Sequence, residues 1–161
     1  KGLNPNQQYC MQYNGMKYYG TMLGDAIKYD RLDIAEYLLT HGADPNKLST
    51  VLLFNESDSF EEDGSVIRHL TPLVMTSEKD VYNEHTSQLI RMLIHFGANP
   101  YDTTSNDTSG GIIPNAPQKL RAFANDRNGY SEEWTSIINL IDSFTTLGLL
   151  DQNLTSSPTK V

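Results

Sequence analysis

The strongest fold signal is the stretch Tyr37-Leu38-Leu39-Thr40-His41-Gly42-Ala43-Asp44-Pro45-Asn46. Together with Ile34, the residues Tyr37, Leu38 and His41 follow the i, i+3, i+4, i+7 spacing that predicts one face of a helix. Gly42 then suits the left-handed position after a helix, where a Cβ is penalised. An aspartate two residues later is typical of a tight turn. The stretch therefore predicts a helix that ends in a glycine-containing tip.

The same pattern occurs twice more. Gly97-Ala98-Asn99-Pro100-Tyr101 follows a second helical run, in which the spaced apolar residues are Leu89, Met92, Leu93 and Phe96. Gly2-Leu3-Asn4-Pro5-Asn6 has the form of a tip alone, so we interpret residues 1–6 as the end of a preceding repeat. The three tip glycines lie 40 and 55 residues apart. These tips predict a repeat protein of irregular period.

A shorter helix is predicted before each long one. Thr21 and Thr71 stand where a short helix would begin, and threonine is a workable N-cap. Pro72 suits the first helical position, because the N–H that it lacks would be unpaired there anyway. Each unit is thus expected to contain a cap, a short helix, a turn, a longer helix and a tip.

The stretch from Thr21 to Asn46 resembles an ankyrin repeat. The matching residues are Thr21, Leu23, Ala26, Ile34, Leu38, Leu39, Gly42, Ala43, Asp44 and Asn46. The departures from the family pattern are Met22 for proline, Gly24 for histidine and Asp30 for glycine in the turn between the helices. Asp tolerates a left-handed backbone better than most residues, so the change at position 30 is mild.

This resemblance implies an all-α fold, an ankyrin-repeat solenoid of stacked helix-turn-helix units with extended loops. We expect an ankyrin domain over residues 1–150, with repeats at 21–46 and 71–101 and a degenerate capping repeat at 118–144. Residues 151–161 are expected to be a flexible tail. The second repeat has extra residues between its helices, at 80–87. The residues expected in the helices of the capping repeat are Leu120, Ala122, Ala124, Trp134, Ile137, Ile138, Leu140 and Ile141.

Long segments separate the units, at residues 47–70 and 102–117. Val51–Phe54 is apolar and is expected to form a short helix or strand that covers the stack, with an exposed anchor as the alternative. The acidic stretch Glu56–Asp63 is interpreted as a solvated loop, or alternatively as a steering patch for a basic partner.

Composition narrows the classes of function. The chain has 161 residues and a formal net charge of −8, which is unfavourable for binding nucleic-acid phosphates. No apolar run approaches the 18 residues or so that a membrane span needs. The ankyrin resemblance implies a non-enzymatic module that binds another protein through its concave face and extended loops. We therefore expect no cofactor, no small-molecule substrate, no nucleic acid and no membrane partner.

Partner-binding residues are assigned by position in the resembled repeat, at the end of the first helix and before each threonine. These residues are Lys17, Tyr18, Lys28, Tyr29, Arg68, His69, Glu78, Lys79, Asn125 and Asp126. Tyr18 and Tyr29 are singled out because tyrosine is enriched at binding hot spots. The alternative for both is local packing against an inserted loop.

Cys10 is the basis of the one enzymatic alternative, a cysteine hydrolase in which His41, His69, His85 or His95 acts as the base. The residues around Cys10 show no catalytic signature, and its apolar neighbours are typical of a buried thiol. We therefore expect no catalytic residue. The four histidines include no i, i+4 pair, so no metal site is expected.

The wider context is also a hypothesis. The first residues lack an initiator methionine, which suggests a piece of a longer protein. That protein is interpreted as a divergent ankyrin protein such as a bacterial effector, or alternatively as a scaffold that positions a catalytic domain elsewhere. One cysteine favours a reducing compartment, hence the cytoplasm, or the host cytosol for an effector. Leu38, Asp44 and Asn46 resemble the pattern that asparagine hydroxylases accept, so Asn46 is a candidate modification site.

Overall fold

The structure is a computed structural model, and it describes residues 2, 4–13, 16–53, 66–77, 84–107, 113–126, 132 and 135–143. Its helices are α1 (Met22–Lys28), α2 (Leu32–Thr40), α3 (Pro72–Ser77), α4 (Glu84–His95) and α5 (Ala116–Asp126). Residues 135–143 are also helical. Its strands are β1 (Gln8–Tyr13), β2 (Met16–Thr21), β3 (Ser49–Leu53), β4 (Val66–Leu70) and β5 (Asn106–Asp107).

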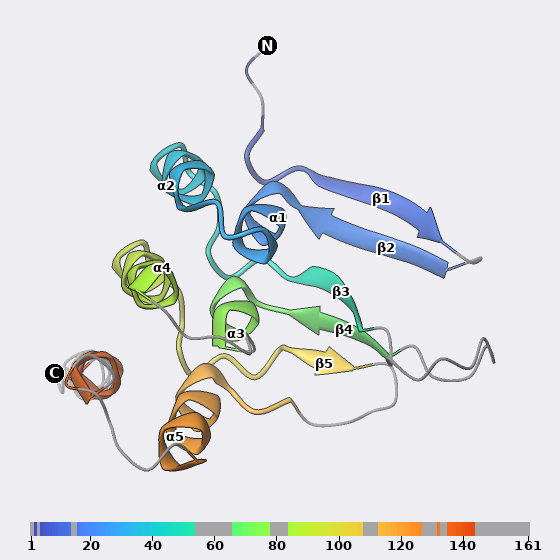
Figure 1. The fold of residues 1–161 in the computed structure, drawn as a ribbon. Coiled ribbons are helices and arrows are strands. Elements are labelled where there is room, and N and C mark those ends of the chain that lie inside the picture. The colour runs from blue at the N-terminus through green and yellow to red at the C-terminus, as the bar shows by residue number, and fades with distance from the viewer. Residues whose placement is uncertain are drawn as a thin grey trace, which may run out of the picture.

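The helices stand in two columns, with the strands on one side of them (Figure 1). The inner column contains α1, α3 and α5, and each packs on the next. The outer column contains α2, α4 and the helix at 135–143, with α2 packed on α4. Leu23, Leu39, Leu93, Leu120 and Ile137 from these helices are buried in a single core cluster. The described helices therefore form stacked layers around one shared core, as expected of a repeat fold.

The expectation of an all-α fold is wrong, because the segments between layers fold into antiparallel strands. β1 pairs with β2 in a hairpin, and β3, β4 and β5 form a sheet in that order. The segments leading to Thr21 and Thr71 are rich in tyrosine, valine, isoleucine and leucine, and their exposed backbone gains partners by pairing. Val51–Leu53 belongs to β3, so the strand alternative for this apolar run is confirmed, whereas Phe54 lies outside the described residues.

The helix ends follow the sequence closely. Gly42 and Gly97 have φ of 87° and 91°, the left-handed conformation that an L side chain disfavours. The N–H of Ala43 donates to the carbonyl oxygen of Leu38 at 2.9 Å, and Ala98 donates to Leu93 at 2.9 Å. These bonds are those of a Schellman motif, which satisfies the last helical carbonyls. Asp30 closes α1 in the same way with φ 54°, so its predicted left-handed backbone is confirmed.

The helix starts differ between the two units. Thr21 caps α1 as predicted, because its Oγ1 accepts from the N–H of Gly24 at 2.9 Å. The predicted side-chain cap at Thr71 is wrong. Its buried Oγ1 has no hydrogen-bond partner among the described residues, and only its carbonyl oxygen accepts from the N–H of Met75, at 2.9 Å. Pro72 does occupy the first position of α3, as the sequence predicts.

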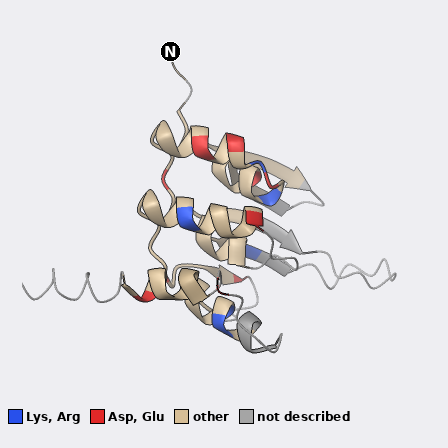
Figure 2. Cartoon of the chain, turned by 60° about the vertical axis from the view of Figure 1, so that its left-hand side comes forward, with Lys and Arg blue, Asp and Glu red and all other residues tan. Residues whose placement is uncertain are grey.

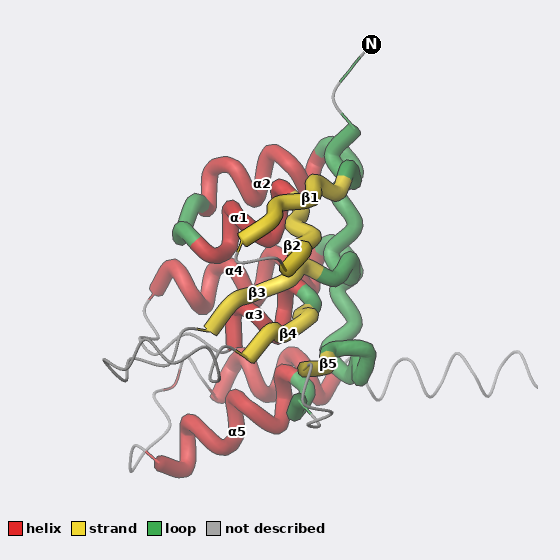
Figure 3. Tube along the Cα trace, turned by 90° about the vertical axis from the view of Figure 1, so that its right-hand side faces the viewer, coloured by secondary structure: helices red, strands yellow, loops and turns green. Residues whose placement is uncertain are grey.

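Asparagine side chains join successive tips, which stack along one edge of the molecule (Figure 3). The Nδ2 of Asn46 donates to the carbonyl oxygen of Gly97 at 3.0 Å, and its Oδ1 accepts from the N–H of Asn99 at 2.7 Å. Asn6 makes the same pair of bonds to the tip below it, with Gly42 at 2.7 Å and Asp44 at 2.6 Å. Asn6 and Asn46 thus tie each of the first two tips to the next one.

The helix predicted from the spacing of Ile34, Tyr37 and Leu38 is confirmed as α2, but its apolar face is mostly not buried. Leu38 is buried, but Ile34, Tyr37 and His41 are exposed at the upper end of the stack. The predicted insertion at 80–87 is also shorter than expected, since α4 already begins at Glu84.

The capping unit matches its prediction in part. Leu120 and Ala122 lie in α5 as expected, where Leu120 is buried and Ala122 is exposed. Ile137 and Ile141 are buried, and Ile138 and Leu140 are half-buried. Ala124 lies in α5 and Trp134 outside the described residues, so the structure says nothing of their side chains. The Tyr101 hydroxyl donates to Asp142 at 3.4 Å, and Arg121 forms an ion pair with the same carboxylate. These contacts fasten residues 135–143 to the layer above and to α5.

Within the described residues, no helix combines the length and the apolar character that a membrane crossing requires.

Candidate protein-binding surface

The end of α1 presents an aromatic side chain next to a cation. Tyr29 is 67% exposed, and the Nζ of Lys28 lies 5.6 Å from the centroid of its ring. At this distance the ammonium group is attracted to the face of the ring. Tyr29 follows directly on the last residue of α1, whose end is fixed by backbone bonds to Asp25 and Ile27. Both predicted contact residues are therefore displayed on a fixed helix end.

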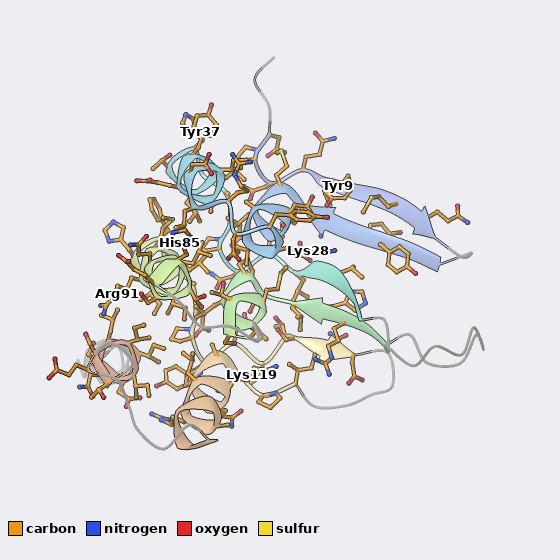
Figure 4. All side chains as sticks on the ribbon, in the orientation of Figure 1. Tyr9, Lys28, Tyr37, His85, Arg91 and Lys119 are labelled. Carbon is orange, nitrogen blue, oxygen red and sulfur yellow. The ribbon has the colours of Figure 1, made fainter. Side chains whose placement is uncertain are left out.

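The β1–β2 hairpin is fastened beside this helix by Tyr9. Tyr9 lies opposite Gly20 in the hairpin register, and its ring occupies the space that a Cβ at position 20 would need. Its hydroxyl donates to the carboxylate of Asp25 in α1. Burial of the phenol raises the pKa of Tyr9, and the hydrogen bond to the Asp25 carboxylate raises it further. Figure 4 shows Tyr9 on the hairpin and Lys28 on the adjoining helix.

The side chains that the hairpin exposes on its surface differ from those predicted from the sequence. Tyr18 is 4% exposed, so the prediction that it contacts a partner is wrong, and local packing is what the structure shows. Its neighbour Tyr19 is 46% exposed and was missed. Thr21 and Thr71 lie 50 residues apart, and the same shift aligns Tyr19 with His69. Because His69 was a predicted contact residue, this alignment could have pointed to Tyr19.

Tyr19 and His69 are joined through Thr50 on β3. The N–H of Tyr19 donates to the Oγ1 of Thr50 at 3.2 Å, and the same oxygen lies 3.2 Å from the Nδ1 of His69. This contact links the hairpin to the neighbouring sheet across the gap between β2 and β3. His69 is half-buried, and so is Arg68, which is paired with Asp107 in the strand register.

For the remaining predicted contact residues, the structure describes no side chain. Lys17 lies in β2, and Asn125 and Asp126 lie at the end of α5. The side chains of these three residues are outside what the structure describes, as are Glu78 and Lys79 altogether. Lys28, Tyr29, Arg68 and His69 are thus the predicted contact residues with described, accessible side chains.

Cys10 is exposed, so the expectation that its thiol is buried is wrong. It lies on β1 opposite Tyr19, and its Sγ donates to the carbonyl oxygen of Met11 at 3.8 Å. His69 is on β4, with β2 and β3 between the two residues, whereas His41 follows α2 and His85 and His95 lie in α4. In the described part of the chain, no group of three His, Cys, Asp or Glu side chains has a metal-binding arrangement.

Charges of both signs are spread over the layers in the described part of the molecule (Figure 2). Around the end of α1, Lys28 is flanked in the sequence by Asp25 and Asp30, so charges of both signs occur there. The acidic stretch Glu56–Asp63 lies outside the described residues. The exposed ring of Tyr29, rather than charge of a single sign, is therefore the main feature of the described end of α1.

The fold and the tips define a class of protein in which helix pairs repeat and stack. Residues 21–50, which contain α1, α2 and the first complete tip, match the family model of the ankyrin repeat. The resemblance that the sequence of this unit shows is thereby confirmed. No curated protein and no solved structure matches the chain. Ankyrin repeats generally mediate binding between proteins, and they are typically not enzymes.

Proposed function

We propose that this chain binds another protein through the surface formed by the end of α1 and the adjoining β1–β2 hairpin. We name this the Tyr29 surface, and its described members are Lys28, Tyr29, Tyr9 and Met11. The observation that supports it most is that Tyr29 is 67% exposed, with the Nζ of Lys28 5.6 Å from the centroid of its ring. A large exposed ring with few rotatable bonds is the kind of side chain that dominates binding hot spots.

The mounting of this surface supports the proposal. Tyr9 fastens the hairpin to Asp25 of α1, and α1 is packed between α2 and α3. A partner would therefore meet side chains whose backbone is already ordered, which lowers the entropic cost of binding. Met11 is exposed on the same side of the hairpin as Tyr9 and extends the apolar part of the surface. The repeat layers thus act as a solenoid that displays a recognition surface.

The experiment is a capture assay with the whole chain as bait and the double variant Lys28→Ala/Tyr29→Ala. We expect the variant to lose the captured protein while its Tm stays within about 2 °C of the wild type, because both side chains are exposed. Tyr37→Ala is the matched control, since Tyr37 is an exposed tyrosine on the outer column. Undiminished capture by the double variant, or equal loss with Tyr37→Ala, would refute this assignment.

The proposed setting is the cytosol, with an effector of an intracellular bacterium as the kind of parent protein. The exposed thiol of Cys10 supports a reducing compartment, because exposed thiols are oxidised elsewhere. Localisation of the tagged parent protein outside the cytosol would contradict this part.

Hydroxylation of Asn46 is also proposed, at the side chain that joins the two tips. Intact mass after treatment with an asparagine hydroxylase should show one added oxygen at Asn46. An unchanged mass would refute it.

A further inference from the structure

The two outer helices have equivalent positions that differ in burial. A shift of 55 residues places Gly42 on Gly97 and therefore aligns α2 with α4. It pairs Ile34 with Leu89, Tyr37 with Met92, and His41 with Phe96. Leu89 is 0% exposed, and Met92 and Phe96 are half-buried against the core. On α2 the same positions are open, with Ile34 39% and Tyr37 61% exposed.

The packing of α2 on α4 accounts for the difference in burial between the two outer helices. Arg91 projects from the other flank of α4 and donates to Ser136 of the helix at 135–143, at 3.1 Å. At 100° per residue, Leu89, Met92 and Phe96 lie about 100–160° around α4 from Arg91. We place this flank on the side of α4 that packs on α2. Figure 4 accordingly shows Arg91 on the lower side of α4 and Tyr37 on the side of α2 remote from α4. No described element covers the flank of α2, although it has the position that a neighbouring helix takes on α4.

The open flank is a flat, partly aromatic surface. The rings of Tyr37 and His41 are stacked with centroids 4.0 Å apart, and Ile34 lies one turn before Tyr37. The Nδ1 of His41 donates to the carbonyl oxygen of Tyr37 at 2.7 Å, which fixes the histidine ring at the helix end. We name Ile34, Tyr37 and His41 the α2 flank.

A repeat tip already stands in the layer above this flank. Asn6 bonds to Gly42 and Asp44 as Asn46 bonds to Gly97 and Asn99. Both tips also contain the same side-chain turn: the N–H of Asn6 donates to the Oδ1 of Asn4 at 3.0 Å, and the N–H of Asn46 donates to the Oδ1 of Asp44 at 2.9 Å. In both complete units, the outer helix leads directly into the glycine of its tip. A helix leading into Gly2 would therefore lie over α2.

We propose that the α2 flank is the docking surface for the outer helix of a further repeat, the unit whose tip contains Asn4 and Asn6. The occupant is an amphipathic helix that enters Gly2 in the same polypeptide. This helix presents small and aliphatic side chains four residues apart to the α2 flank. In the same way, Ala35 and Leu39 of α2 are buried in the core cluster that contains Leu89 of α4. This proposal is independent of the Tyr29 surface.

The experiment extends the whole chain with its own sequence. A copy of residues 8–41 is placed directly before Gly2, so that the copied α2 enters the tip; a second version carries a copy of residues 66–96. We expect at least one extension to raise Tm by about 4 °C or more and to slow amide exchange in Leu32–Thr40 roughly tenfold, because the flank becomes buried. Unchanged exchange in α2 with both extensions would overturn the proposal.

A substitution tests the docking surface itself. In the extended chain, Tyr37→Asp should remove the gain in Tm and in protection, whereas in the unextended chain it should change Tm little, because Tyr37 is exposed. Tyr29→Asp is the matched control and should leave the gain intact. A gain that survives Tyr37→Asp would overturn the proposal. So would sedimentation of the unextended chain as a dimer that Tyr37→Asp converts to a monomer, since the flank would then be a self-association surface.

Discussion

Ser49 lies where a side chain at position 24 would begin. A Cβ built on Gly24 would stand 2.8 Å from the Cβ of Ser49 and even closer to its Oγ. That hydroxyl also accepts from the N–H of Thr21 at 3.0 Å and lies 2.8 Å from the Oγ1 of Thr21. The serine of the second layer therefore holds the first turn of α1 in the first, and glycine at position 24 makes room for it.

Gly24→Ala should consequently destabilise the protein, although alanine is the better helix former. We expect a loss of about 1–3 kcal/mol in the free energy of unfolding, measured by urea denaturation, because the buried Ser49 must shift. Ser49→Gly in the same chain should recover part of this loss. Strictly additive effects of the two substitutions would show that no contact between these positions limits the fold.

Asn46→Ala should weaken the junction between the two tips. The substitution removes two hydrogen bonds, to Gly97 and Asn99, and we expect it to lower the free energy of unfolding by about 1–2 kcal/mol. Asn46→Asp should be no milder, because a carboxylate would face the carbonyl oxygen of Gly97 without a donor. Thermal denaturation of both variants checks this, with the exposed Thr103→Ala as the control. Wild-type stability of Asn46→Ala would mean that the tips are held by other contacts.

Ile34→Ala and Leu89→Ala form a matched pair at equivalent helix positions. Leu89 is fully buried, so its truncation should cost about 2–5 kcal/mol, whereas the partly exposed Ile34 should cost less than about 1.5 kcal/mol. Chemical denaturation of both variants gives the comparison. Equal losses would show that the α2 flank is covered in solution.

Tyr9→Phe should change the response of the protein to alkaline pH. The folded state raises the pKa of Tyr9, so it binds the phenolic proton more tightly than the unfolded state does. The stabilisation is therefore complete below the ordinary tyrosine pKa of about 10 and is lost as the pH rises above it. We expect the free energy of unfolding to fall less steeply above about pH 10 in Tyr9→Phe than in the wild type. Parallel curves for the two proteins would exclude a special role of this phenol.

Local sequence determined where the helices end and how the units repeat. Gly42 and Gly97 stop α2 and α4 because the left-handed residue after a helix needs no information beyond its own backbone. The left-handed aspartate of the α1–α2 turn and the threonine cap of α1 depend on local sequence in the same way. The ankyrin character of residues 21–50 follows from these local signals.

The tertiary structure decided what is exposed and what lies between the layers. Tyr18 is buried and Tyr19 is not, although both are tyrosines in one strand, because the hairpin presents alternate residues to opposite sides. Ile34 and Leu89 have the same place in the repeat, but among the described residues a neighbouring outer helix packs before α4 and none packs before α2, so Leu89 is buried and Ile34 is not. Strand pairing and burial depend on which distant segment lies alongside, and that neighbour is not encoded in the local spacing of residues.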